Sequence, residues 1–172
     1  MDGAIDEQVY VAMGSNLGDR DAHLAAGLVA LRASEGIEVV AVSPLYETDP
    51  IGPPPQGPYL NGAIQLATSL DPAALLKRLL EIEAEQGRTR GADRNAPRTL
   101  DLDLLLYGDR KWVGPDLEIP HPRLAERPFV LEPLCDLAAD FIHPVLGETI
   151  RALALRVRDP AAVRLRTSII TR

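Results

Sequence analysis

Two aspartates interrupt an otherwise leucine-rich stretch at residues 98–106, Arg-Thr-Leu-Asp-Leu-Asp-Leu-Leu-Leu. Side chains alternate between the two faces of a β-strand, so Asp101 and Asp103 point to one face, roughly 6.6 Å apart along the strand, and the leucines between them point to the other. Two uncompensated carboxylates beside a buried face are strongly unfavourable. The pattern therefore predicts a divalent cation, arginines or water at this pair, and Mg²⁺ is commonly held by one or two carboxylates together with substrate phosphates.

Arginines cluster just before these aspartates, at Arg88, Arg90, Arg94 and Arg98. The planar guanidinium group matches a phosphate with two parallel hydrogen bonds, so the cluster predicts binding of a small polyanion. Arg98 lies three residues before Asp101 and is the strongest phosphate candidate. The alternatives are solvated aspartates on an edge strand and a solvated charged loop.

Four further side chains could recognise a ligand. Asn61 lies in a mostly apolar segment, where its amide either satisfies backbone groups or reads the hydrogen-bonding edge of a ligand; the residues favour neither alternative. Tyr59 and Phe129 either pack in the core or form a platform for a flat heterocycle. His121 lies between two prolines, and we expect it at a rigid turn within reach of a phosphate.

Bulk composition limits the class of protein. The chain has 172 residues, 46% of them hydrophobic, and a net charge of −7, which predicts one globular domain over residues 1–172 and argues against a broad nucleic-acid-binding surface. The acidic N-terminal segment does not resemble a signal peptide, and no apolar stretch is long enough to span a bilayer. Because Cys135 is the only cysteine, an intrachain disulfide and a thiolate zinc cluster are excluded. We expect a cytoplasmic protein with no nucleic-acid and no membrane partner.

The elements that must position these residues follow from hydrophobic periodicity and turn signals. Strands are expected at 9–13, 37–46, 59–69 and around the two aspartates, and helices at 20–34 and 72–86, with an exposed Pro/Gly loop at 49–58. Asp71 and Pro72 are a typical helix start, and Gly87 a typical stop. The order β-α-β-β-α-β predicts an α+β fold of the ferredoxin-like type, an antiparallel sheet with two helices on one face. The aspartates should then lie on the helix-free face.

The C-terminal third is less regular. The sequence predicts a hairpin around 109–113 and a short helix over 128–138, and it gives no placement for the tail after Ile142. We therefore expect a core over about residues 8–140 and a C-terminal extension over about 141–172.

Several motifs occur together in the order found in one enzyme family. They are Gly-Ser-Asn-Leu-Gly-Asp at 14–19, Ser-Pro-Leu-Tyr-Glu-Thr at 43–48, Tyr-Leu-Asn at 59–61, Glu83 with Gly-Arg at 87–88, Pro-Arg-Thr-Leu-Asp-Leu-Asp at 97–103 and Ile-Pro-His-Pro at 119–122. On these residues the chain resembles the hydroxymethyldihydropterin pyrophosphokinases of folate biosynthesis. The resemblance covers about residues 8–140.

The resemblance implies transfer of pyrophosphate from ATP to the hydroxymethyl group of 6-hydroxymethyl-7,8-dihydropterin, with release of AMP. It implies a monomer that binds these two small molecules and two Mg²⁺ ions. The implied roles fall into four groups: catalytic, Arg88, Arg98, Asp101 and Asp103; metal-binding, Asp101 and Asp103; ATP-binding, Glu83, Arg90, Arg94, Arg98, His121 and Arg127; pterin-binding, Thr48, Ile51, Tyr59, Asn61 and Phe129.

One departure from the family pattern concerns the arginine loop. Where the family often has Trp-Gly, this chain has Asn95 and Ala96. The missing aromatic side chain predicts weaker loop closure over the substrates. Two other functions compatible with the paired aspartates are a two-metal phosphohydrolase or nuclease and a non-catalytic pterin or nucleotide binder.

Overall fold

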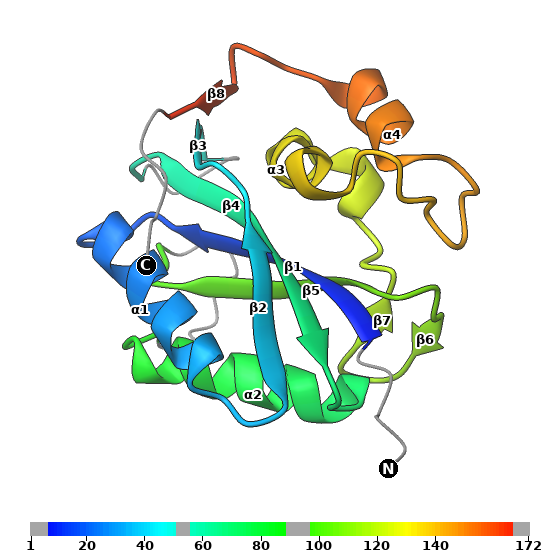
Figure 1. Cartoon of the computed structure of the whole chain (residues 1–172). Helices are drawn as coiled ribbons and strands as arrows, with labels where there is room; N and C mark the ends of the chain where they lie inside the picture. The colour runs from blue at the N-terminus through cyan, green and yellow to red at the C-terminus, as the bar shows by residue number, and fades with distance from the viewer. Residues whose placement is uncertain (1–6, 51–55, 89–96, 167–172) are drawn as a thin grey trace.

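The computed structural model describes residues 7–50, 56–88 and 97–166 (Figure 1). Its elements in chain order are β1 (Glu7–Ser15), α1 (Arg20–Arg32), β2 (Ile37–Val42), β3 (Tyr46–Thr48), β4 (Tyr59–Thr68), α2 (Pro72–Glu85), β5 (Asp101–Tyr107), β6 (Trp112–Val113), β7 (Glu118–Ile119), a 3₁₀ turn (Leu124–Glu126), α3 (Pro128–Ala138), α4 (Ile150–Val157) and β8 (Val163–Leu165). The predicted strands and helices of the β-α-β-β-α-β unit are present, in the predicted order.

Local sequence signals set the ends of α1 and α2. Asp19 and Asp71 cap the two helices by accepting hydrogen bonds from backbone N–H groups three residues later. Helix α2 stops at Gly87, whose φ of 81° is unfavourable for residues with a side chain. Just beyond it, the Arg88 N–H donates to the carbonyl of Glu83. The end of α2 thereby fixes the start of the arginine-rich segment.

Within the described residues, six strands form one antiparallel sheet in the order β5-β1-β4-β3-β8, with β2 also paired to β4. Strand β1 lies between the edge strand β5 and the central strand β4. In this register Gly14 lies opposite both Asp101 and Asn61, and Ala12 lies opposite Asp103. Directly opposed residues share a face. Asp101, Gly14 and Asn61 therefore form one row across the sheet, and Asp103 and Ala12 belong to the next row on the same face.

Helices α1 and α2 pack on one face of the sheet and bury a cluster that includes Leu100, Leu102 and Leu104. The aspartates lie on the opposite face, as the alternation predicts. That face is not helix-free, however, because α3 and α4 lie over part of it (Figure 1). Its apolar residues, such as Leu105, need cover, and the apolar side of α3 provides it.

Two other sequence predictions need correction, and the structure places the tail that the sequence left open. The strand expected over 37–46 is divided into β2 and β3, because Pro44 has no N–H to donate to a ladder. The hairpin expected around 109–113 is formed by β6 and β7, so its turn comes later, at 114–117. The tail left unplaced contains α4, which packs with α3, and β8, which extends the sheet beside β3. In the described ranges, every helix is too short or too polar to cross a membrane.

Candidate active site

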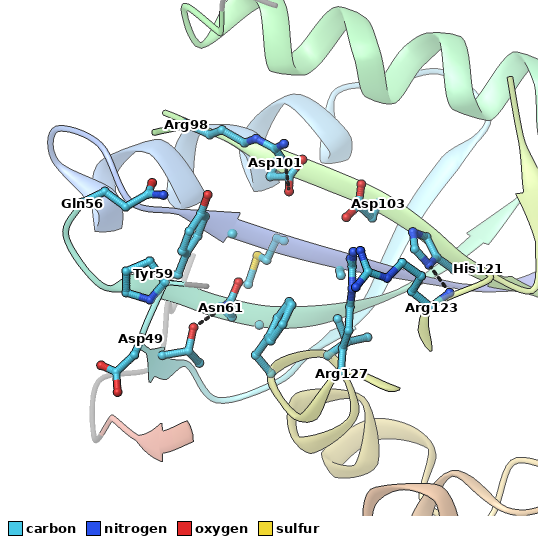
Figure 2. A pocket seen from close by; sticks show the side chains of 18 residues that line it. Asp49, Gln56, Tyr59, Asn61, Arg98, Asp101, Asp103, His121, Arg123 and Arg127 are labelled. Atoms are coloured by element: carbon cyan, nitrogen blue, oxygen red, sulfur yellow. Dashed lines mark hydrogen bonds and ion pairs between the residues drawn. The ribbon is translucent and has the colours of Figure 1, made fainter. Parts of the chain in front are cut away.

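A cavity of about 430 Å³ lies over the exposed part of this second sheet face (Figure 2). Strands β1, β4 and β5 form its floor, and residues 121–130 and the ends of the 49–58 loop form its walls. The lining residues that bear on the chemistry are Gly14, Thr48, Gln56, Tyr59, Asn61, Arg98, Asp101, Asp103, His121, Arg123, Arg127 and Phe129.

The floor leaves space for a ligand because β1 contributes the small residues Ala12 and Gly14 there. A Cβ atom placed on Gly14 would lie 2.6 Å from Oδ1 of Asn61 and 3.7 Å from the ring of Tyr59. Real Cβ contacts are not that short, so any larger residue would displace Asn61. The glycine therefore permits Asn61 to lie against the floor.

Asp101 is surrounded by arginine. Its two carboxylate oxygens accept hydrogen bonds from Arg88 at 2.8 Å and from Arg98 at 2.9 Å. Arg88 also pairs with the buried Glu83, whose other oxygen accepts the Leu102 N–H at 3.1 Å. Glu83 thus ties α2 to β5 and holds Arg88 against the strand.

Asp103 has a different environment, because burial, followed by the nearby Asp101 and Glu83 carboxylates, raises its pKa to about 7. The positive charges of Arg127 and Arg98 only partly oppose this effect. Two carboxylates on one face, one of them held partly protonated by its surroundings, suit a hard cation that replaces the proton. The donor set thus fits the predicted Mg²⁺, with further oxygen ligands from phosphate or water. In the described part of the chain, His, Cys, Asp and Glu side chains form no metal-binding group of three or more.

The opposite wall is basic. The Arg123 N–H donates to Nδ1 of His121 at 3.1 Å, so the ring proton belongs on Nε2. Burial, together with Arg127 and Arg123, lowers the pKa of His121 and keeps the ring neutral. The Arg127 guanidinium lies 5.7 Å from the ring centroid of Phe129. This wall offers an imidazole N–H and two guanidinium groups to an anion.

Asn61 and Thr48 form the polar end of the floor. Nδ2 of Asn61 donates to Oγ1 of Thr48 at 2.6 Å, inside the sheet. Of the two alternatives for Asn61, the structure therefore supports a side chain at a cavity over one that satisfies backbone groups. With Nδ2 engaged, Oδ1 remains as the acceptor beside Gly14. The ring of Tyr59 lies near it (Figure 2), and Phe129 lines the same cavity.

The structure brings together nine of the predicted site residues along this cavity: Thr48, Tyr59, Asn61, Arg98, Asp101, Asp103, His121, Arg127 and Phe129. Arg88 and Glu83 lie behind Asp101 and are not among the lining residues. Ile51, Arg90 and Arg94 lie outside the described residues, as does Asn95.

Sequence reasoning missed Arg123, Gln56 and Gly14. Arg123 lies two residues after His121, and that spacing was a usable signal. Gly14 begins the motif at 14–19, but its place opposite Asp101 and Asn61 depends on strand register, and the place of Gln56 depends on the loop that leads into β4.

The fold and the site define an α+β protein with an open antiparallel sheet, on which paired carboxylates and arginines are arranged as in phosphoryl-transfer sites. Residues 10–139 match the 7,8-dihydro-6-hydroxymethylpterin-pyrophosphokinase (HPPK) family, and the chain belongs to this family. The family predicted from the motifs is thereby confirmed. Its enzymes transfer a pyrophosphoryl group from ATP to hydroxymethyldihydropterin in folate synthesis.

Curated relatives agree. The chain is 47% identical over 138 residues to the 2-amino-4-hydroxy-6-hydroxymethyldihydropteridine pyrophosphokinase of Pseudomonas aeruginosa. The aligned residues cover 80% of this chain and 85% of the relative. It is 44% identical over 128 residues to the enzyme of that name from Bacillus subtilis, covering 74% of this chain and 76% of the relative.

Solved structures show the same fold. One is wild-type HPPK-DHPS of Plasmodium falciparum with pteroate, with a TM-score of 0.69 at 14% identity over 88% of this chain. The match covers 44% of that protein, so the chain spans less than half the length of this solved relative.

Proposed function

We propose that this chain transfers the terminal pyrophosphate of ATP to the hydroxymethyl oxygen of 6-hydroxymethyl-7,8-dihydropterin, releasing AMP, and that two Mg²⁺ ions bind at Asp101 and Asp103. The observation that carries the proposal is the row formed by Asp101, Gly14 and Asn61 across three adjacent strands. Two strand spacings separate its ends by roughly 9.6 Å. This span allows a heterocycle at Asn61 to present a substituent to phosphates at the aspartates.

The phosphate end depends on charge. Mg²⁺ bound there would neutralise phosphate oxygens and bring the attacking and leaving oxygens together. Arg98 and Arg127 face the cavity and donate to phosphate oxygens as charge develops on the transferred group. When Arg98 turns to phosphate, it leaves an Asp101 oxygen available to the cation. The neutral His121 supplies an N–H without adding charge.

Arg88 acts from behind the cavity. Its paired partners Glu83 and Asp101 fix its guanidinium beside the metal-binding carboxylate. We propose that Glu83 contributes to ATP binding through Arg88, since hydrogen bonds to Arg88 and to the Leu102 backbone occupy its oxygens. Arg90 and Arg94 are proposed as further ATP-binding residues on the family pattern.

The pterin end depends on hydrogen-bond direction. Since Nδ2 of Asn61 donates to Thr48, Oδ1 is the group that accepts from the N–H donors on the amide-like edge of a pterin. Tyr59 and Phe129 are proposed to flank the ring, and Ile51 to contact it from the loop.

We also propose that the protein acts as a cytoplasmic monomer, without nucleic-acid or membrane partners, and that residues 141–172 extend a single domain.

The test is to incubate the protein with ATP, Mg²⁺ and hydroxymethyldihydropterin and to identify the nucleotide product with and without the pterin. We expect AMP that depends on the pterin and disappears when EDTA removes the metal. Formation of ADP, or nucleotide release indifferent to the pterin, would support a phosphohydrolase instead. Pterin binding without any product would support a binder. AMP formation that persists in EDTA would contradict the metal assignment alone.

A further inference from the structure

The turn between β1 and α1 contains Asn16, a buried residue that the mechanism above does not use. The Asn16 N–H donates to the Arg98 carbonyl at 3.0 Å, and the Arg98 N–H donates to Oδ1 of Asn16 at 2.8 Å. Asn16 therefore binds both the N–H and the carbonyl of Arg98. Because Arg98 is a proposed phosphate ligand, Asn16 fixes the backbone from which that ligand extends.

The other end of the same amide reaches a different part of the cavity. Nδ2 of Asn16 donates to Oε1 of Gln56 and, at 3.4 Å, to the carbonyl of Gly57. These residues lead into β4, which carries the pterin-side Tyr59 and Asn61. Gln56 and Arg98 both line the cavity, and Arg98 lies beside Asp101 (Figure 2).

The described side-chain bonds of Asn16 all reach outside its own turn. The turn and the helix start are already provided by Gly18, with a φ of 72°, and by Asp19, which caps α1. The side chain of Asn16 therefore has a role other than local turn formation. An amide holds a donor and an acceptor about 2.3 Å apart on one rigid plane. A shift of the Arg98 backbone must therefore move the Asn16 amide and with it Gln56 and Gly57. A shift of Gln56 or Gly57 must likewise move Arg98.

We propose that Asn16 is a positioning residue that couples the phosphate end of the cavity to its pterin end. The proposal rests on the proposed function, since it takes Arg98 as an ATP ligand. Coupling between sites is reciprocal, so bound nucleotide increases pterin affinity by the same factor by which pterin increases nucleotide affinity. Loss of the Asn16 side chain removes that factor without removing any group that touches either substrate.

Arg20, the first residue of α1, provides a matched control because it holds the same end of the loop that leads into β4. Its guanidinium donates to the carbonyl of Pro58 at 3.0 Å and to Glu47 at 2.8 Å, and its described bonds do not include Arg98. Arg20→Met keeps the aliphatic part of the side chain and releases the same end of the loop. It should weaken pterin binding equally with and without nucleotide, and so preserve the coupling factor.

The experiment measures the dissociation constant of 6-hydroxymethylpterin by calorimetry, with and without Mg²⁺ and a non-hydrolysable ATP analogue. Wild type, Asn16→Ala and Arg20→Met are compared. We expect nucleotide to tighten pterin binding in wild type and in Arg20→Met. In Asn16→Ala the coupling factor should fall about tenfold or to one, the effect of losing the three side-chain hydrogen bonds of Asn16, while each ligand alone binds within about threefold of wild type.

A wild-type factor of one, or an unchanged factor in Asn16→Ala, would overturn the proposal. If wild type still forms pterin-dependent AMP in that case, the coupling role fails and the proposed function stands. If wild type forms no such AMP, the proposed function itself has failed.

A second set of variants tests the same contact if Asn16→Ala does not fold. In Asn16→Asp the carboxylate still accepts from the Arg98 N–H, and the Gln56 amide can turn to donate to it. In Gln56→Glu the carboxylate accepts from Asn16. The double variant places two carboxylates face to face, so we expect each single variant to retain coupling and the double variant to lose it. Coupling retained in a folded double variant would refute the role of this contact.

Discussion

Replacing Asp103 by asparagine should make the protein more stable at pH 8 and inactive. The ordinary pKa of an aspartate side chain is 3.8, whereas that of Asp103 is about 7. Between these values the folded protein keeps a proton that the unfolded chain releases, so the stability contribution of Asp103 falls as pH rises. By pH 8 the ionised side chain destabilises the fold by about 4 kcal/mol, an effect that the neutral, isosteric asparagine does not have.

Thermal unfolding in EDTA at pH 4 and at pH 8 measures this difference. At roughly 2–4 °C per kcal/mol for a chain of this length, Asp103→Asn should raise Tm by about 8–16 °C at pH 8. At pH 4, near the pKa of the unfolded chain, it should leave Tm almost unchanged. Turnover at pH 8 should be lost, because the variant lacks one metal-binding carboxylate.

Asp101→Asn is the matched control. Asp101 accepts from Arg88 and Arg98, so loss of its charge should destabilise the protein by about 1–3 kcal/mol while also abolishing turnover. The two variants are thus expected to change Tm in opposite directions. A lower Tm for Asp103→Asn at pH 8, or a Tm difference that does not depend on pH, would refute the reasoning, because it would mean that Arg127 and Arg98 stabilise an ionised Asp103.

Three further predictions concern the same cavity. Mg²⁺ should bind more tightly as pH rises through about 7, and binding should release a proton from Asp103. Calorimetry in two buffers of different ionisation enthalpy measures the number of protons released. Release of no proton at pH 6 would contradict the role of Asp103. Gly14→Ala should raise KM for the pterin about tenfold or more with a smaller change in KM for ATP, because its Cβ would lie 2.6 Å from Oδ1 of Asn61; equal changes in both constants would argue against the assignment of the two ends. Glu83→Gln should destabilise the protein by about 3 kcal/mol in denaturant titrations and should reduce kcat, because Arg88 loses a buried ionic partner. An unchanged kcat in a folded variant would show that Arg88 does not need Glu83 for its position.

Much of the fold was available from the sequence because its signals are local. Asp71, Pro72 and Gly87 mark the ends of α2 through capping and backbone conformation, and these effects depend on neighbouring residues alone. Alternation along β5 placed Asp101 and Asp103 on the face opposite the core leucines for the same reason. The Pro-Arg-Thr-Leu-Asp-Leu-Asp segment and its companion motifs identified the family.

Where local signals are weak, contacts between distant segments decide the placement of an element. The pairing of β3 with β4 and of β8 with β3 depends on which strand each segment meets. The α3 and α4 layer depends on apolar residues of the sheet that have no sequence neighbours in those helices.

The site shows the same division. Residue types alone predicted a divalent cation, arginines or water at the aspartates and a polyanion at the arginines, since charge chemistry is carried by each side chain. Only the tertiary structure decided that Asp101 is neutralised by two arginines while burial raises the pKa of Asp103 to about 7. Likewise, only strand register places Gly14 between Asp101 and Asn61, and only the folded loops bring Asn16 to both Arg98 and Gln56. Burial and register are properties of segments far apart in the chain, so no local pattern encodes them.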